Sequence, residues 1–535
     1  MPASATTSPD RRRQRRERRA LVVFGILLLS FLLYAPSIGN DFTWDDRFAA
    51  MGSGARPHPL VAQLHPLGDY FANNWWPQHS PSSQAYRPLT TLWFALRHAV
   101  CGDHALVAHL ANVLLHTATV GLCFLWLRRL GAGFRGAALG CLVFGLHAIH
   151  SESVASLVGG AELLALTCGL GACLVLQCGL AAGRRRFWLH YPIGALLLFA
   201  AASSKESGLA WVAFAPLCAL VPVVRRGQTW ASMRVDLAAL AVTAALPATA
   251  YLALRAQMLA NLPNNVDPAV GLLENPLLDL PAAARAASGV LAWGYGLLLT
   301  VFPFRLSTDY GPSQLPIVAA ASDSWAFGAL AVAAAFAGIM GLGMRYRHPL
   351  VFLATACFFG FSVMTSNVLR PVFMHFAERS YVTPSLALAL LVAWAARRMK
   401  GRRALACAAA LAVWCIASIA TALPRNFVFA DDTTLVLSEV RNSPRSVRMQ
   451  LCAGAVHAQR GDFAIAREHW QTAAALAPDL PQPWIELARL AMRRGDFDEA
   501  RACLQRASAG APRERRRLAN VLMALTAEIG LAAPR

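Results

Sequence analysis

Long apolar segments recur along most of the first 424 residues of this chain, and they constrain its fold more than any other feature. A helical segment of about 18 residues or more can cross a hydrocarbon layer about 30 Å thick. The chain of 535 residues is 56% hydrophobic and 15% charged, whereas about a quarter of the residues in soluble domains are charged. The sequence therefore predicts an all-α, polytopic membrane protein.

The arrangement of these segments follows from their length and from the loops between them. By window length, the candidate spans are 21–39, 105–127, 134–150, 155–182, 187–203, 206–224, 236–254, 286–303, 324–343, 349–367, 380–396 and 404–423. Lys and Arg next to spans stay in the cytoplasm, and arginines cluster in several of the short loops. The loops expected to be cytoplasmic hold Arg128, Arg185, Arg225, Arg345 and Arg398. The loops expected to face outward are 40–103, 150–155, 203–206, 255–285 and 368–379.

The number of crossings depends on segment 286–303. Three candidates lie between the cytoplasmic loops at Arg225 and Arg345, where only an even number is possible. Segment 286–303 is the weakest of them, because it holds three glycines and ends at Pro303. We expect it to be re-entrant or to lie against the bundle, since irregular backbone at that depth must be buried in protein. About eleven crossings remain, with the N-terminus in the cytoplasm and the C-terminus outside.

The arginines that contribute to the net charge of +20 cluster in the loops expected to be cytoplasmic. Nucleic acid is therefore not an expected partner. Residues 1–20 are expected to be a basic cytoplasmic segment before an uncleaved first span. The outward loop 40–103 is rich in Trp, which favours the membrane interface. Its stretches 57–74 and 88–100 are candidate interfacial helices.

A repeat appears beyond Pro424, where the composition becomes that of a soluble protein. Gly461, Asp462, Phe463, Ala466, Ala473 and Pro478 recur as Gly495, Asp496, Phe497, Ala500, Ala507 and Pro512. The constant offset of 34 residues is the period of the tetratricopeptide repeat (TPR). Because two repeats alone are marginal, 512–530 is expected to form a capping helix. The prediction is a transmembrane domain at 21–424, a linker at 425–446 and a TPR module at 447–535.

Adjacent carboxylates follow the first span, in the stretch Asp41 to Arg47. Crowding two like charges at a membrane surface raises the pKa of one of them, which suits a general base. Asp45 and Asp46 are therefore candidate catalytic residues. A solvated acidic turn is the alternative.

Further polar residues fall on the same outward side. His147 and His150, three residues apart, share a face, and Glu152 follows them closely. Such a group could bind a metal or a phosphate, or form a hydrogen-bonded interfacial cluster. Lys205 is a ready phosphate ligand, unless it is balanced by the neighbouring Glu206. In such a set, the cations suit the binding of a lipid phosphate, and a carboxylate suits the role of base for an incoming nucleophile. The remaining members of the set are Tyr86, Arg87, Glu378 and Arg379.

Taken in order, these strings resemble the transmembrane-and-TPR (TMTC-type) O-mannosyltransferase family, relatives of the protein O-mannosyltransferases with the GT-C fold. The stretches that carry the resemblance are 41–47, 86–89, 112–116, 147–154, 159–165, 204–208, 302–310 and 378–384, followed by the TPR tail. The order and spacing of these stretches are more specific than any one of them. The resemblance implies a GT-C type bundle and transfer of a sugar, with mannose expected, from a polyprenyl-phosphate donor to Ser or Thr hydroxyls of proteins.

The same resemblance implies roles for the candidate residues. One of Asp45 and Asp46 would be the base on the outer face. The donor phosphate would be held by Arg87, His147, His150, Glu152, Lys205 and Arg379, supported by Tyr86, Glu206, Asp309 and Glu378. The lipid-linked sugar is the expected donor, a divalent metal stays open, and the TPR module would bind the acceptor protein.

Two departures from the family pattern put the sugar identity in doubt. His-Ala-Ile-His stands at 147–150 where the family has His-Pro-x-His, and Gly159 is followed by Gly160 instead of Arg. We expect an integral protein of a bacterial inner membrane, in contact with membrane lipid and with its TPR module in the periplasm. The alternatives are a transporter or flippase of lipid-linked sugars and a non-catalytic TPR scaffold.

Overall fold

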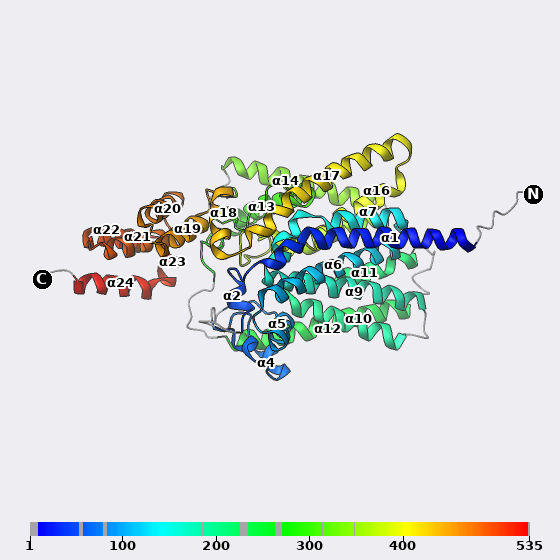
Figure 1. Ribbon diagram of the computed structural model, residues 1–535, viewed down its shortest axis with the longest axis horizontal. Helices are drawn as coiled ribbons and strands as arrows, with labels where there is room; N and C mark the ends of the chain where they lie inside the picture. The colour runs from blue at the N-terminus through cyan, green and yellow to red at the C-terminus, as the bar shows by residue number, and fades with distance from the viewer. Residues whose placement is uncertain are drawn as a thin grey trace, which may run out of the picture.

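The structure is a computed structural model, and it describes residues 9–52, 57–78, 83–182, 187–224, 234–262, 270–311, 314–320, 322–346 and 348–532. Within these ranges every regular element is a helix, as predicted. Long helices run side by side along the long axis of the molecule, and a separate group of short helices lies at its C-terminal end (Figure 1). The N-terminal helix projects from the opposite end.

Seven helices of the described ranges are long and apolar enough to cross a membrane. The α-helical parts of these seven spans are α1 (Pro9–Tyr34), α6 (Ala105–Arg129), α9 (Gly160–Ala182), α12 (Arg234–Ala260), α14 (Ser324–Arg345), α16 (Leu386–Arg398) and α17 (Gly401–Val428). An eighth is possible if α7 (Gly133–Gly145) and α8 (Ser151–Ala155), which are bent by 47°, form one span. Three predicted segments are shorter apolar helices, namely α10 (Phe187–Ser204), α11 (Trp211–Val224) and α15 (Pro349–Ser362). The predicted count of eleven crossings is therefore not confirmed by helix length.

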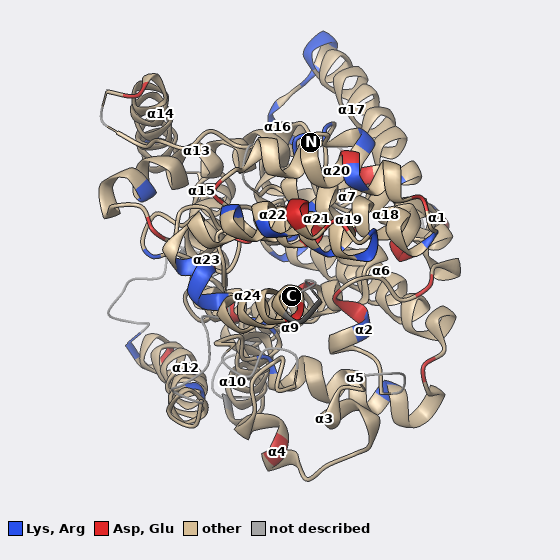
Figure 2. Cartoon of the chain, turned by 90° about the vertical axis from the view of Figure 1, so that its left-hand side faces the viewer, with Lys and Arg blue, Asp and Glu red and all other residues tan. Residues whose placement is uncertain are grey.

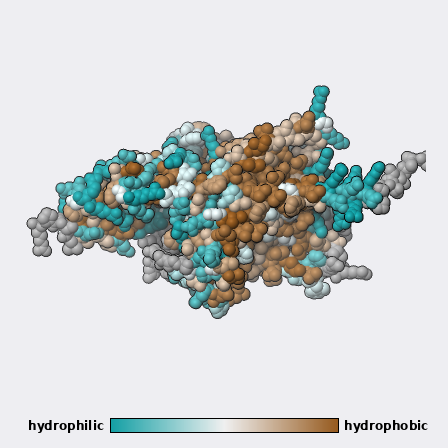
Figure 3. Space-filling model, in the orientation of Figure 1, coloured by the Kyte–Doolittle hydropathy of each residue, from teal (hydrophilic) through white to brown (hydrophobic). Residues whose placement is uncertain are grey.

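The surface supports a membrane position for the bundle. Figure 3 shows a hydrophobic band around the middle of the molecule, with hydrophilic surface at both ends. Large apolar side chains in this bundle are widely exposed, such as Leu246 and Leu330 at 65% and 68%. An exposed apolar surface of this extent marks a contact with lipid or protein. Arg397 donates to the carbonyl of Gly131, which joins two of the arginine-rich loops at one end; Arg185 and Arg225 lie outside the described residues.

Helix α13 (Ala282–Val301) is the segment that was expected not to cross. It is unbroken, and its flanks contact helices near the C-terminal end: Asp279 pairs with Arg513 of α23 (Pro512–Arg517) at 2.7 Å, and Ser307 donates to Glu439 of α18 (Asp432–Asn442) at 2.9 Å. The chain thus enters and leaves this helix at the same end of the bundle. Its glycines serve close packing rather than irregular backbone, because a Cβ at Gly296 would overlap the ring of Tyr381.

The described residues of loop 40–103 form four helices, α2 (Asp46–Ala49), α3 (Pro59–Ala62), α4 (Leu67–Ala72) and α5 (Pro88–Cys101). Helix α5 matches the bounds of the candidate helix at 88–100. The candidate at 57–74 is instead two short helices, because a proline stands at the start of each, Pro59 at the first position of α3 and Pro66 before α4. Proline fits a helix start, where no N–H is needed.

The C-terminal module consists of two helical hairpins, formed by α19 (Val447–Gln459) with α20 (Phe463–Leu476) and by α21 (Pro481–Arg493) with α22 (Phe497–Ala509). Gly461 and Gly495 occupy the two turns at φ of +86° and +75°, a backbone conformation that favours glycine. The predicted capping helix is two helices, α23 (Pro512–Arg517) and α24 (Ala519–Ala532). Helix α24 covers the second hairpin by burying Leu522, Leu525 and Ile529.

Candidate functional site

The two candidate carboxylates stand on one tight turn but face different surroundings. The N–H of Asp46 donates to the carbonyl of Thr43 at 2.9 Å, which closes the turn over Trp44 and Asp45. Asp46 is completely buried, whereas 45% of the Asp45 side chain is exposed. Neighbouring residues of the same type therefore differ in their access to a ligand.

Asp46 uses its carboxylate to attach the outward loop to the turn before α9. Its Oδ1 accepts from the N–H of Val158 at 2.9 Å and from Ser156 Oγ at 3.1 Å, and its Oδ2 accepts from the N–H of Thr43 at 3.3 Å. Burial raises the pKa of Asp46 to about 6, and these hydrogen bonds only partly oppose the rise. With both oxygens occupied inside the protein, Asp46 is suited to a structural role.

Asp45 belongs to a more open group of charges. Arg379 Nη1 lies 3.9 Å from Asp45 Oδ2 and 3.3 Å from Glu152 Oε1. The three residues come from the loop after α1, from α8 and from the short 3-10 helix Glu378–Tyr381. Since 25% of the Arg379 side chain is exposed, the guanidinium is accessible while it stands between the two carboxylates. The structure thus brings together three residues that sequence analysis had placed on one side.

Two further cations are paired across the fold rather than with sequence neighbours. Lys205 forms an ion pair with Glu162, and Arg87 Nε lies 3.1 Å from Glu206 Oε2. The N–H of Tyr86 also donates to Glu206, at 2.8 Å. The expected alternative, a local balance of Lys205 by Glu206, is replaced by these two longer-range pairs. Lys205 lies within electrostatic range of both Arg87 and Arg379, so the predicted phosphate-binding cations lie in one region, where each is paired with a carboxylate.

The two histidines lie inside the bundle. His147 Nε2 is 2.9 Å from the carbonyl of Thr300, and His150 Nε2 is 2.9 Å from Ser385 Oγ. Both are completely buried, and their rings stack with centroids 5.4 Å apart. Among the described residues, no group of three or more His, Cys, Asp or Glu side chains is arranged to hold a metal. Of the three open readings of this motif, the hydrogen-bonded cluster agrees best with these contacts.

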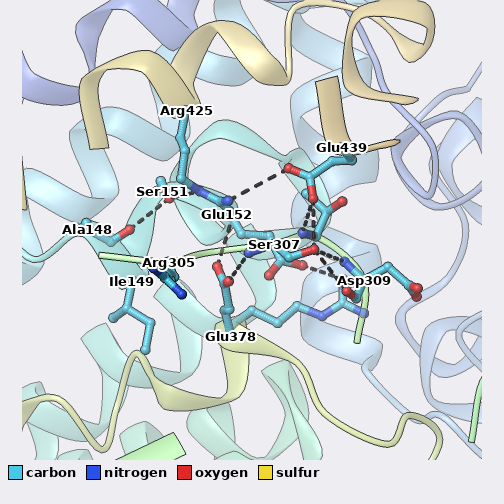
Figure 4. Close-up of polar contacts among 12 residues, drawn as sticks. Ala148, Ile149, Ser151, Glu152, Arg305, Ser307, Asp309, Glu378, Arg425 and Glu439 are labelled. Carbon is cyan, nitrogen blue, oxygen red and sulfur yellow. Dashed lines mark hydrogen bonds and ion pairs between the residues drawn. The ribbon is translucent and has the colours of Figure 1, made fainter. Parts of the chain in front are cut away.

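Sequence analysis named Glu378 but missed its partners Arg425 and Glu439, which form a second charged network with it. Arg425, near the end of α17, lies 3.0 Å from Glu378 and 3.9 Å from Glu439, and its Nε donates to Ser151 Oγ at 3.0 Å. Figure 4 shows these side chains converging from separate parts of the chain. Glu439 belongs to α18 (Asp432–Asn442), within the segment expected to be a linker. Arg425 stands alone at the end of the last apolar segment that was expected to face outward, against the positive-inside pattern, and this was the signal that could have revealed it.

The remaining predicted residue, Asp309, connects the bundle to the repeat module. Its carboxylate accepts from Ser446 Oγ at 2.7 Å and lies 3.1 Å from Arg448 Nε. Arg448 is on α19, the first helix of the module. Figure 2 views this end directly and shows acidic and basic residues on the module helices and around them. The module therefore lies at the same end of the bundle as the candidate site.

Comparison with known proteins supports the repeat assignment. Residues 457–525 match the family model described as tetratricopeptide repeat. This match and the two hairpins confirm the TPR module that was predicted from the 34-residue offset.

The resemblance to the TMTC-type family is also confirmed. Protein O-mannosyl-transferase Tmtc1 of Drosophila melanogaster is 32% identical over 210 residues, which cover 38% of this chain and 23% of the relative. Protein O-mannosyl-transferase TMTC3 of Mus musculus is 24% identical over 473 residues, 83% of this chain and 50% of the relative. Protein O-mannosyl-transferase F38B6.6 of Caenorhabditis elegans is 24% identical over 403 residues, 73% and 54% of the two chains. The chain spans between about a fifth and about a half of the length of such relatives.

Among solved structures, one match is the crystal structure of ArnT from Cupriavidus metallidurans bound to undecaprenyl phosphate. The TM-score is 0.41 at 15% sequence identity, with 96% of this chain and 77% of that chain covered.

Proposed function

We propose that this protein is a GT-C type membrane glycosyltransferase that transfers a sugar, expected to be mannose, from a polyprenyl-phosphate donor to Ser or Thr hydroxyls. The observation that carries the proposal is the half-exposed Asp45 beside Arg379, on a turn that contacts α18, the helix that leads into the TPR module. The names of the relatives support the reaction class. On this proposal the site faces away from the cytoplasm, in the periplasm of a bacterial cell.

The chemistry asks for a base and for cations, and this chain supplies both. The acceptor hydroxyl oxygen attacks the anomeric carbon of the donor sugar, and Asp45 takes the hydroxyl proton. The bond between that carbon and the phosphate oxygen breaks, and the polyprenyl phosphate leaves with its electron pair. Arg379, Lys205 and Arg87 balance the negative charge that develops on the phosphate, an effect that is usually the largest single contribution to catalysis.

Access decides between the two adjacent aspartates. A general base must reach within hydrogen-bond distance of the proton that it removes. Asp45 is accessible to an acceptor hydroxyl, because almost half of its side chain is exposed. Asp46 is enclosed, and both of its oxygens already accept hydrogen bonds from protein groups. We therefore assign the base to Asp45 and the support of the turn to Asp46.

The TPR module offers a groove for the acceptor polypeptide. The groove is a cavity of about 560 Å³ lined by residues of α20, α21 and α22, including Trp484, Glu499 and Arg506. The guanidinium of Arg506 stacks over the Trp484 ring at 4.7 Å. An aromatic ring flanked by charges suits an extended peptide, so this module would present Ser or Thr to the site.

Replacing Asp45 by Asn tests the proposal directly. Purified protein in lipid vesicles would receive polyprenyl-phosphate mannose and a Ser/Thr-rich peptide, and mass spectrometry would count the transferred hexose. We expect Asp45→Asn to lower the rate about 10²–10⁴-fold, the usual contribution of a general base. An unchanged rate would show that Asp45 is not the base.

Asp69→Asn is the matched control, because Asp69 lies in the same outward loop and 48% of its side chain is exposed. This variant should transfer sugar at the wild-type rate. If the wild-type protein carried lipid-linked sugar across the vesicle membrane and transferred none to the peptide, the transporter reading would replace this proposal.

A further inference from the structure

We infer that Asp432, on the helix that joins the last apolar helix to the TPR module, is a positioning residue for Asp45. This inference rests on the proposed function, since it concerns the turn that would carry the base. Asp432 is the first residue of α18. It is separated from Asp45 by almost the whole membrane part of the sequence.

The turn before Asp45 needs support from outside itself. Trp44 has φ of +48°, which lies in the left-handed region that bulky residues rarely adopt. Strained backbone of this kind persists only where the surrounding structure holds it in place, and it is often found at functional sites. Trp44 directly precedes Asp45, so whatever fixes the Trp44 backbone also holds in place the backbone from which the Asp45 carboxylate projects.

Asp432 supplies two of the contacts that hold this turn. Its Oδ1 accepts from the N–H of Trp44 at 2.7 Å, and its Oδ2 lies 2.8 Å from Arg47 Nε. The N–H of Asp41 also donates to the carbonyl of Ala430 at 2.9 Å. One carboxylate thus spans the turn on both sides of Asp45, from Trp44 to Arg47.

Packing at the same place strengthens the connection. The Trp44 side chain packs against a small apolar cluster that contains Phe429, Leu435 and Ala155. Phe429 and Leu435 stand just before and just within α18, while Ala155 ends α8, the helix that carries Glu152. The start of α18 therefore contacts both sides of the open charged group.

The neighbouring Asp431 provides a control within the same helix start. Its carboxylate caps α18 by accepting from the N–H of Thr434 at 2.9 Å and from the Thr434 hydroxyl at 2.7 Å. Asp431 thus stabilises its own helix, whereas Asp432 reaches across to the catalytic turn. Of these two adjacent residues, Asp431 caps its own helix and Asp432 contacts the turn that carries Asp45.

Hydrogen–deuterium exchange on the full chain in detergent tests the contact without using activity. In Asp432→Ala, the amides of Asp46, Arg47 and Phe48 should exchange about tenfold faster, because the turn opens locally more often. In Asp431→Ala, these amides should exchange as in the wild type, while the first turn of α18 loses protection. Equal exchange of the 41–48 stretch in Asp432→Ala and wild type would overturn the inference.

Steady-state kinetics test the consequence for catalysis. Asp432→Ala should lower kcat about tenfold to a hundredfold, because a misplacement of about 1 Å can cost that much. The KM for the lipid donor should stay within about twofold, since Arg87 and Lys205 are held by other contacts. Asp432→Asn keeps an oxygen for the Trp44 N–H but loses the ion pair with Arg47, so its kcat should lie between those of Asp432→Ala and the wild type.

The outcomes separate this inference from the proposed function. A kcat for Asp432→Ala equal to that of Asp431→Ala would overturn the positioning role. A wild-type protein that transfers no sugar would instead overturn the proposed function. In that case the exchange measurement still decides whether Asp432 holds the turn.

Discussion

Two groups of ionisable side chains lie at the same end of the bundle and differ in their exposure to water. In the open group, 45% of the Asp45 side chain and 25% of the Arg379 side chain are exposed, while Glu152 is 9% exposed. Arg379 lies 3.9 Å from Asp45 and 3.3 Å from Glu152. In the closed group, Arg425 is 8% exposed, and the side chains of its partners Glu378 and Glu439 are completely buried. Similar residue types thus form two different kinds of site.

The difference indicates which group can take a ligand. A buried charge that loses its partner keeps the full cost of its own desolvation, so a closed pair cannot exchange a partner for substrate. A partly exposed pair is weaker, because water screens it, and a phosphate or hydroxyl can replace one member. We therefore expect substitutions in the closed group to lower stability and substitutions in the open group to lower activity.

Removing the closed arginine should have the largest effect. Arg425→Met leaves Glu378 and Glu439 buried without their cation, and breaking such a pair costs about 3–5 kcal/mol of stability. The measurement is the fraction of protein that stays folded in detergent after heating. The double variant Arg425→Met, Glu378→Gln should recover part of the loss, because one unpaired charge is then removed as well. A single variant as stable as the wild type would contradict the distinction between the two groups.

Removing the open arginine should affect activity more than stability. Arg379→Gln takes away a cation that we expect to stand by the departing phosphate, and the loss of one such group typically lowers kcat about 10²–10³-fold. Its stability should decrease less than that of Arg425→Met, because only one of its two carboxylate partners, Glu152, is buried. Transfer rate and heat resistance are measured on the same preparation. If Arg379→Gln unfolded as readily as Arg425→Met, the open group would be structural.

Asp46 extends the comparison, because its carboxylate is buried while that of the adjacent Asp45 is partly exposed. Its folded-state pKa is raised to about 6 from 3.8, so between about pH 4 and pH 6 the folded protein holds a proton that the unfolded chain has lost. The stability that this proton contributes is present below about pH 4 and is lost as the pH rises to about 6. The loss amounts to about 2–3 kcal/mol.

Asp46→Asn has no proton to lose at this position, so its stability should decrease less than that of the wild type over the same pH range. Unfolding midpoints measured from about pH 4 to about pH 7 give the two slopes. Parallel slopes would mean that Asp46 is ionised throughout and that its hydrogen bonds outweigh its burial.

Local sequence patterns predicted the helices and the repeat, because an apolar run and a 34-residue offset are properties of neighbouring residues. They also placed Asp45, Glu152 and Arg379 on one side, since the positive-inside rule relates distant loops to the membrane. They could not separate Asp45 from Asp46, because the burial of Asp46 depends on Val158, more than a hundred residues away.

The closed group was missed for a similar reason. Glu439 lies on a polar helix that reads as a linker, and only its contact with Arg425 gives it a place in the fold. In the opposite sense, His147 and His150 have a spacing typical of ligands, yet their rings are enclosed and bonded to a carbonyl and a hydroxyl. Burial by distant segments decides the role of each of these residues, and no local pattern reports it.

The smallest effect should come from the shortest of the ion pairs compared here. On the TPR surface, Arg501 Nη1 lies 2.6 Å from Asp498 Oδ1, closer than the 3.0 Å between Arg425 and Glu378. However, 94% of the Asp498 side chain is exposed, and exposed pairs of this kind contribute little because water and salt screen them. Asp498→Asn should leave the unfolding midpoint within about 1–2 °C of the wild type. A loss as large as that of Arg425→Met would mean that distance, and not burial, sets the strength of these pairs.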